Sequence, residues 1–305
     1  MAVSKIKSYE FELEEMRRVF KSEKFQQEFE ENGFIKIPFL SEAQVDLLLT
    51  NYRTIEEEHT KIGIPFITTS HSNNSDLIRK ADEMIAAVFH PEMEKLLDNY
   101  QLLFGNFLIK SAGLESITPP HQDTTFVDES KFSSISFWVS LEDTNKNNGC
   151  MRFIKGSHKF LSVKRPSHSY LWAFENVKPE LEKMMTDFPS RKGEAFIFHH
   201  AVIHASYGNQ TQKPRVAAVM AAYPSEAELW MVFQKPNFPE LLQTYSMSKE
   251  AYLNFVKGVP PSLGNLINEE PTDFLQLSKE DFTNLTIPKL SFFSKLLKPF
   301  GIKTH

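Results

Sequence analysis

A histidine and an aspartate, His121 and Asp123, stand one residue apart directly after Pro119-Pro120. In an extended segment the side chains of residues i and i+2 point to the same side. An imidazole and a carboxylate from this short stretch can therefore reach one metal ion. A second histidine from a distant strand would complete two histidines and one carboxylate on one face of the metal. Such a set leaves coordination positions open and suits iron(II) oxygenases.

The second histidine has three candidates in the stretch 192–206. This stretch contains a glycine turn, an apolar strand and then His199, His200 and His204. Distance along the chain does not choose among the three. A single His-x-Asp pair is also a weak signal in a chain with ten histidines.

Another histidine and acid two residues apart, His90 and Glu92, flank Pro91. Proline is favoured at the first position of a helix, and residues i and i+2 of a helix do not face each other. We therefore expect a new helix to start at Pro91, and we expect this pair to bind no metal.

An arginine, Arg215, opens the apolar stretch 215–223, eleven residues after His204. A buried charge without a partner is costly, so an arginine that enters an apolar strand needs an anion. The planar guanidinium can hold a carboxylate through two parallel hydrogen bonds. The distal carboxylate of 2-oxoglutarate would be such a partner. The alternative is a structural salt bridge within the protein, and the sequence leaves it open.

The elements that must position these residues change in character near Tyr100. Before this point the pattern is mostly helical, with a short strand at 34–38. After it, short apolar runs alternate with turn residues, which is typical of a sandwich or barrel. The expected helices cover 8–31, about 41–59 with Ser41 as N-cap, 75–89 and 91–99. The expected strands cover 102–110, 134–141, 151–154, 194–199 and 215–223.

The chain shows no internal repeat and no low-complexity linker, so we take residues 1–305 as one domain with three parts. Residues 1–100 form a mostly helical N-terminal part, and residues 101–224 form the β-rich core with the candidate site. Residues 225–305 are expected to be a helical and loop-like extension, because several prolines interrupt them.

The composition is that of an ordinary globular protein, with 41% hydrophobic and 24% charged residues. The net charge of −5 argues against a nucleic-acid partner, which favours a basic surface. The one cysteine, Cys150, excludes an intrachain disulfide and a Cys-rich zinc site, and we expect it to be buried. The N-terminus is charged, and no apolar run reaches membrane-spanning length, so a cytoplasmic location is expected. The basic amphipathic segment 289–298 is expected to dock on its own domain, without stable membrane association.

Four blocks of the sequence together resemble the phytanoyl-CoA dioxygenase family, over about Asn32 to Tyr223. The first is Asn32-Gly33-Phe34-Ile35-Lys36-Ile37-Pro38 with Leu40-Ser41, and the second is Phe107-Leu108-Ile109-Lys110 followed by His121-Gln122-Asp123. The third is Asn147-Asn148-Gly149-Cys150-Met151 with Gly156-Ser157-His158-Lys159. The fourth is His204-x-Ser206-x-x-Asn209 with Arg215. The chain departs from the family pattern at Ser111 and Lys155, where proline is usual, and only the local loop shape is in doubt there.

The resemblance implies a mainly β fold with flanking helices and a double-stranded β-helix core, which is a jelly roll of the cupin kind. It implies iron(II) held by His121, Asp123 and His204, with His204 favoured over its neighbours by its spacing to the fourth block. It implies that Arg215 binds the far carboxylate of the cosubstrate 2-oxoglutarate and that Ser206 is a second contact. By position, Trp138 and Asn106 match residues that line the same pocket. Lys110 belongs to a family motif, but no role follows for it.

The activity implied by the resemblance is hydroxylation of an unactivated C–H bond with 2-oxoglutarate and O2, which gives succinate and CO2. Desaturation or cyclisation would use the same chemistry. Halogenation is disfavoured, because related halogenases have a small residue where this chain has Asp123. One rival is a jelly-roll protein that binds or senses a metal or ligand without turnover. Another is a zinc or manganese jelly-roll enzyme without 2-oxoglutarate, which would not need Arg215.

The substrate is expected to be a small organic molecule, because the loops show no strong basic cluster for the phosphates of an acyl-CoA. Candidate lid loops cover 62–74, 124–132, 166–172 and the tail after Ser225. The oligomeric state cannot be predicted from the sequence. Aromatic residues that could line an apolar substrate pocket, or could belong to the core, are Phe66, Phe126, Tyr170, Trp172 and Trp230.

Overall fold

The fold is described by a computed structural model, which covers residues 16–57, 64–160, 163–167, 173–235, 237–254, 259–271 and 277–284. Its α-helices are α1 Glu23–Asn32, α2 Glu42–Arg53, α4 Ser75–Leu96, α5 Lys178–Met184 and α6 Lys249–Leu253. Short 3-10 turns cover Thr69–His71, Leu114–Ser116, Ser157–Lys159 and Glu175–Val177. None of the helices in these ranges is long and apolar enough to cross a membrane.

The strands form three antiparallel sheets. A six-stranded sheet has the order β1 Phe34–Pro38, β8 Glu194–His199, β5 Ile135–Ser140, β10 Arg215–Pro224, β3 Tyr100–Lys110 and β2 Phe66–Thr68. A four-stranded sheet has the order β4 Thr118–His121, β9 His204–Ser206, β6 Met151–Phe153 and β7 Thr186–Phe188. A third sheet has the order β11 Trp230–Lys235, β12 Phe238–Ser246 and β13 Asn265–Pro271.

The six-stranded and four-stranded sheets pack face to face around an aromatic interior. Residues of both sheets meet there, among them Phe34, Trp138, Phe153, Phe196 and Phe198. The ring centroids of Phe34 and Phe153, which come from opposite sheets, lie 4.3 Å apart. Burial of such side chains is the main stabilising contribution to a two-layer β fold. The expected jelly-roll core is confirmed, and each of the five expected strands after Tyr100 is present.

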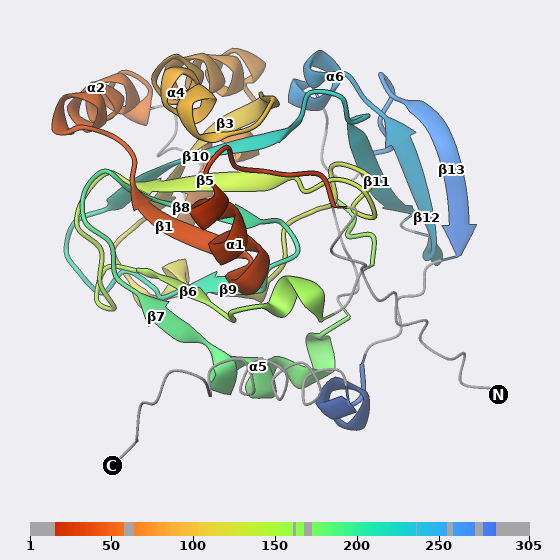
Figure 1. The fold of residues 1–305 in the computed structure, drawn as a ribbon. Coiled ribbons are helices and arrows are strands. Elements are labelled where there is room, and N and C mark those ends of the chain that lie inside the picture. Colours follow the sequence, from red (N-terminus) through yellow and green to blue (C-terminus); the bar gives the residue numbers. More distant parts are fainter. Residues whose placement is uncertain are drawn as a thin grey trace.

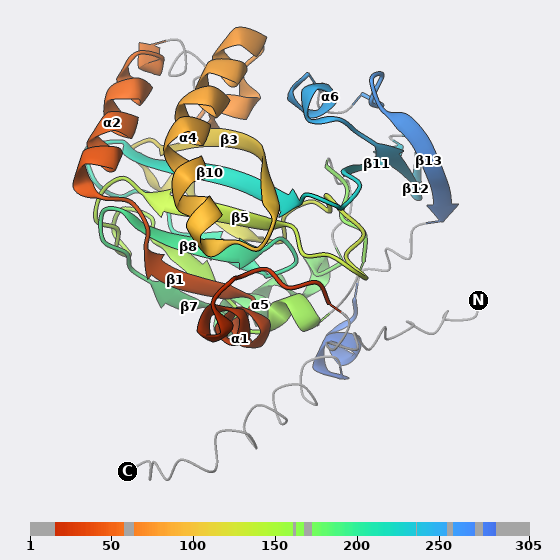
Figure 2. The same cartoon turned by 45° about the horizontal axis from the view of Figure 1, so that its top comes forward.

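Helices α2 and α4 cover the outer face of the six-stranded sheet, as Figures 1 and 2 both show. Ser41 caps α2 as expected, in a reciprocal capping box with Gln44. The helix before β1 ends at Gly33, whose φ of 80° lies in the left-handed region and whose N–H donates to Phe29 O. Within the described residues that helix begins only at Glu23, whereas the sequence pattern predicted helix from residue 8, and residues 1–15 lie outside the description.

The prediction that a new helix starts at Pro91 is wrong, because Pro91 lies inside the single helix α4. A proline inside a helix costs about 3 kcal/mol or more. The apolar face of α4 continues across it, since Val88, Phe89 and Met93 are all buried against the sheet. Burial of two large side chains and a valine offsets that cost. His90 and Glu92 therefore lie on a helix, where they do not converge, as expected.

The prediction of a helical and loop-like tail after Pro224 is also wrong for most of its described residues. Strands β11, β12 and β13 form a sheet beside the jelly roll, and α6 lies near one end of that sheet (Figure 1). Pro239 lies near the start of β12, where the pairing with β11 shifts register. A proline is tolerated at the start of a strand or at a bulge. The segment 289–298 lies outside the described residues.

Candidate metal site and cosubstrate pocket

The structure brings His121, Asp123 and His204 together between two strands of the four-stranded sheet. His121 ends β4 and pairs directly with His204, the first residue of β9. Asp123 Oδ1 lies 3.8 Å from His121 Nε2 and 3.8 Å from His204 Nε2. One ligand atom from each residue lies within 4.8 Å of the others. In the described ranges no other three His, Cys, Asp or Glu residues are arranged in this way.

Both histidines are held in the tautomer that a metal needs. His121 Nδ1 donates to Pro119 O at 2.9 Å, and His204 Nδ1 donates to Val202 O at 3.1 Å. A carbonyl can only accept, so the proton of each neutral ring must be on Nδ1. Each Nε2 then presents a free lone pair towards Asp123. Hydrogen bonds of this kind fix ring orientation at metal sites and raise ligand basicity.

His200 supports Asp123 through Ser136 and does not join the cluster itself. Both of its ring nitrogens are occupied, since Nδ1 lies 2.8 Å from Ser134 Oγ and Nε2 lies 2.9 Å from Ser136 Oγ. Ser136 Oγ also lies 3.4 Å from Asp123 Oδ2. The main-chain N–H of Asp123 donates to His200 O at 2.9 Å. His199 Nδ1 accepts a hydrogen bond from Ala201 N. Neither of the two rival histidines, His199 and His200, therefore joins the cluster.

The surroundings of the cluster favour an ionised Asp123 carboxylate and a neutral His204 imidazole. Burial raises the pKa of the Asp123 carboxyl, but His204, His200, His121 and Arg165 outweigh that effect and keep it below its usual value. Burial lowers the pKa of His199, His200 and His204 to about 4 each. These are the protonation states in which a divalent cation is bound, since metal ligands must be deprotonated.

The same burial predicts that the metal-free protein loses stability on mild acidification. The folded-state pKa of about 4 lies below the value near 6.5 of an exposed histidine, so the unfolded chain takes up the protons first and stability falls as pH falls. At pH 5 each of the three histidines should cost about 2 kcal/mol relative to pH 7.5. Urea unfolding of metal-free protein at the two pH values measures this loss. His200→Gln should lessen it, whereas His90→Ala, a change at a half-exposed histidine, should not.

Arg215 is the first residue of β10, and its side chain enters the interior of the jelly roll. The residue is 2% exposed, and its Nε and Nη1 are buried without any hydrogen-bond partner. The guanidinium carbon lies 5.3 Å from the ring centroid of Trp138. Burial lowers the pKa of Arg215 to about 10, which still leaves it charged at neutral pH. Within the described residues Arg215 forms no salt bridge, and the Glu142 carboxylate acts on it only through a weaker electrostatic interaction that opposes the effect of burial.

Lys110 lies directly across from Arg215 in the β10–β3 pairing, and it is fully buried. Its Nζ donates to Ser116 O and to Thr118 Oγ1, the latter at 3.1 Å. Burial, with Arg215 as a further cause, lowers the pKa of Lys110 to about 7. The sequence motif gave no role for Lys110. Together with the charged guanidinium of Arg215, it makes this end of the interior positive, which favours an anionic ligand.

Two of the three other residues predicted for the cosubstrate lie near this positive end. Ser206 is buried two residues after His204 and pairs with Thr118, the residue that Lys110 Nζ contacts. Trp138 lies under Arg215. Asn106 is buried on β3 opposite Val219, with its Oδ1 3.4 Å from Thr69 Oγ1. The structure thus groups Arg215, Trp138 and Ser206 around one end of the interior, and places Asn106 further along β3.

The predicted substrate residues fall in different places. Phe126 packs edge-on against His200, which supports the cluster through Ser136, with 4.7 Å between ring centroids. Trp230 is joined to it, because Trp230 N donates to Phe126 O at 2.7 Å. Phe66 lies instead at the positive end, where Lys110 Nζ is 4.8 Å from its ring. Tyr170 and Trp172 lie outside the described residues, so the substrate wall stays a prediction.

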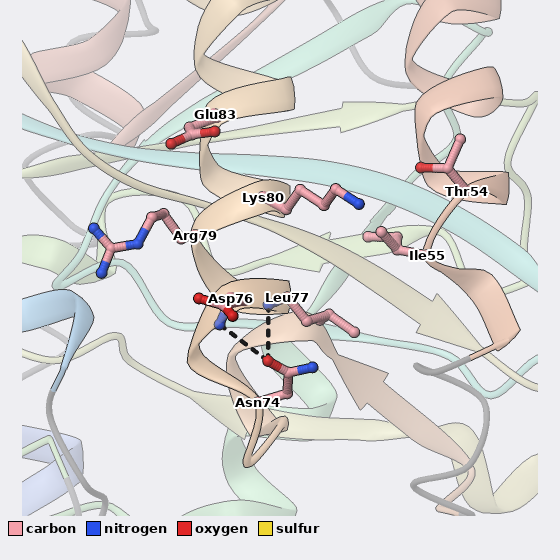
Figure 3. A pocket seen from close by; sticks show the side chains of 8 residues that line it. All are labelled: Thr54, Ile55, Asn74, Asp76, Leu77, Arg79, Lys80 and Glu83. Atoms are coloured by element: carbon pink, nitrogen blue, oxygen red, sulfur yellow. Dashed lines mark hydrogen bonds between the residues drawn. The ribbon is translucent and has the colours of Figure 1, made fainter.

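A hollow of about 370 Å³ lies elsewhere, on the helical outer layer (Figure 3). It is lined by Thr54 and Ile55 after α2 and by residues of the segment 74–83 at the start of α4. None of the predicted site residues lines it. Its charged rim, with Asp76, Arg79 and Lys80, is solvated and does not take part in the site described above.

Comparison with known proteins identifies relatives of this chain. A family model described as phytanoyl-CoA dioxygenase matches residues 29–217. Phytanoyl-CoA dioxygenase domain-containing protein 1 of Danio rerio is 29% identical over 141 residues, which are 44% of this chain and 48% of that protein. The phytanoyl-CoA dioxygenase of Arabidopsis thaliana is 30% identical over 141 residues, 45% of this chain and 50% of that protein. The chain thus spans about half the length of these relatives.

Solved structures share the fold at low sequence identity. The epimerase SnoN in complex with Fe3+, alpha ketoglutarate and nogalamycin RO has a TM-score of 0.53 at 19% identity, and the match covers 81% of this chain and 95% of that one. The alpha ketoglutarate dependent carbocyclase SnoK has the same TM-score and identity, with 81% and 96% covered. The model match extends over more than half of the chain and includes the metal cluster and Arg215. This chain belongs to the phytanoyl-CoA dioxygenase family.

Proposed function

We propose that this protein is an iron(II)- and 2-oxoglutarate-dependent dioxygenase that hydroxylates an unactivated C–H bond of a small organic substrate. One observation carries the proposal. The same jelly-roll interior holds a cluster of two histidines and one carboxylate, and a buried arginine that has two unpaired nitrogens. A metal alone would explain the cluster but not Arg215. A cosubstrate that chelates the metal and ends in a carboxylate explains both.

The donor set fits iron(II). Two imidazole nitrogens and one carboxylate form the facial set that leaves positions for a bidentate cosubstrate and O2. When bound, iron supplies the redox chemistry that couples decarboxylation of 2-oxoglutarate to oxidation of the substrate. The protein supplies the ligand atoms, with both imidazoles held by backbone carbonyls and the carboxylate held near Ser136.

The positive end of the interior orients the cosubstrate. Arg215 would bind the far carboxylate through its free nitrogens, and Trp138 keeps the guanidinium in place by stacking. Lys110, which a pKa of about 7 leaves partly protonated at neutral pH, lies at the same end and holds Ser116 and the first residue of β4, Thr118. Phe198 and Phe153 pack on the His204 ring with centroids at 4.7 and 6.0 Å, which excludes water from the inner side of the cluster.

The test is succinate formation by protein reconstituted without oxygen and then given iron(II), 2-oxoglutarate and O2. Slow succinate production that depends on all three is the expected result, since oxygenases of this kind turn over weakly without their substrate. A metabolite that stimulates it would then be examined for the gain of one oxygen atom. Binding of metal and 2-oxoglutarate without any succinate would favour the sensing protein. Metal-dependent activity that ignores 2-oxoglutarate would favour the zinc or manganese enzyme.

A further inference from the structure

Arg165 is a buried arginine whose side chain contacts the main chain of the candidate metal carboxylate. It is 4% exposed, and its Nε donates to Asp123 O at 2.6 Å. Its Nη1 and Nη2 donate to the two carboxylate oxygens of Glu129 at 2.8 and 2.5 Å. The Glu129 side chain is itself 9% exposed. A bidentate buried pair of this kind holds the guanidinium in one orientation.

The segment around Arg165 is also bonded to the main chain that follows Asp123. Thr125 N donates to Arg165 O at 3.0 Å, and Arg165 N donates to Thr125 Oγ1 at 3.0 Å. Thr124 Oγ1 donates to Arg165 O at 3.1 Å. Hydrogen bonds therefore hold two segments side by side, residues 163–167 and residues 123–125, although neither segment belongs to a regular strand.

Asp123 differs in this respect from the two histidines. His121 and His204 lie on paired strands, whereas Asp123 lies in the irregular segment after β4. Its main chain is held by two bonds, from its N–H to His200 O and from Arg165 Nε to its C=O. No strand pairing fixes the direction of its carboxylate. The bond from Arg165 is thus one of the two hydrogen bonds that hold the Asp123 main chain itself.

We propose that Arg165, held in place by Glu129, is a positioning residue that sets the direction of the Asp123 carboxylate towards the metal. The inference rests on the proposed function, since it needs Asp123 to be a metal ligand. The tie extends further, because Ser167 N donates to Val232 O on β11 at 2.9 Å, and Trp230 N of the same strand donates to Phe126 O. These bonds connect the third sheet to the segment that carries Asp123. The connection runs through the two predicted lid loops, 124–132 and 166–172. The third sheet itself lies beyond the residues that the family model matches.

The experiment compares Co(II) binding by metal-free wild-type protein and by variants, without 2-oxoglutarate or O2. Arg165→Met should weaken Co(II) binding by roughly 10- to 100-fold, the usual effect of losing a partner that orients a metal ligand. It should also change the visible Co(II) absorption, which reports ligand geometry. Arg165→Lys keeps a cation near Glu129 but loses the forked geometry, so it should fold and still bind Co(II) more weakly than wild type.

Arg152→Met is the matched control. Arg152 is also a buried arginine, 8% exposed, and it pairs with Glu182 and Asp187, but it contacts none of the three metal residues. It should lose thermal stability and keep wild-type Co(II) affinity and absorption. Unchanged Co(II) affinity in both Arg165 variants, with wild-type binding intact, would overturn the positioning role and leave the proposed function standing. Wild-type protein that binds no Co(II) at the cluster would overturn both.

Discussion

Asp123→Ala should abolish iron-dependent succinate formation and leave the fold intact. The variant removes one of three ligands, so the affinity for iron(II) should fall by more than the roughly 10- to 100-fold that loss of a supporting hydrogen bond costs. The folded protein loses little, because the Asp123 carboxylate makes only one side-chain contact of hydrogen-bond length, a long one of 3.4 Å to Ser136. Equilibrium dialysis with iron(II) and a succinate assay measure the two effects, and thermal unfolding of the metal-free protein tests the fold.

His90→Ala is the control that the chain itself offers. His90 and Glu92 repeat the His-x-acid pattern, but they lie on α4, where His90 is half exposed and 3.8 Å from Glu94. The variant should bind iron(II) and form succinate as wild type does. Full metal content and turnover in Asp123→Ala would mean that the metal lies elsewhere, and a loss in His90→Ala would mean that the assay reports stability.

The sequence was most informative where a local pattern has a single physical meaning. The capping box at Ser41 and the left-handed turn at Gly33 were predictable from residue types, because few residues satisfy these geometries. The pair His121 and Asp123 followed from the period of an extended chain. The choice of His204 rested on the resemblance to a family, and in the structure the ring nitrogens of its rival His200 are occupied by two serines.

The errors arose where tertiary packing overrides a local signal. Pro91 marks a helix start by propensity, but the apolar face of α4 continues past it and keeps the helix whole. Strand β13 could not be recognised, because nearly all of its residues are exposed and no alternation of apolar and polar residues appears. The ion pair of Arg165 with Glu129 joins two irregular segments, and no pattern in the sequence relates residues of that kind.

Arg215→Met should weaken the binding of 2-oxoglutarate without lowering the stability of the metal-free protein. Loss of a buried hydrogen-bonded charge partner costs about 2–5 kcal/mol, so the affinity for 2-oxoglutarate should fall by roughly 30- to 4,000-fold. The metal-free protein should be at least as stable as wild type. Arg215 has two buried nitrogens without partners, and each such group costs about 1–3 kcal/mol in the folded state. Titration with 2-oxoglutarate and urea unfolding without ligand measure the two quantities.

Arg165→Met supplies the contrast, because its guanidinium is equally buried but paired. Its removal leaves the buried Glu129 carboxylate without its ion-pair partner, and breaking such a buried pair costs roughly 3–5 kcal/mol of stability. If Arg165 and Arg215 both served only the fold, Arg165→Met and Arg215→Met would both lower the stability of the metal-free protein. A loss confined to Arg165→Met, with 2-oxoglutarate binding lost in Arg215→Met, is the pattern expected if Arg215 is kept charged and unpaired for the far carboxylate of the cosubstrate. Destabilisation of the metal-free Arg215→Met protein by several kcal/mol would instead show that Arg215 serves the fold.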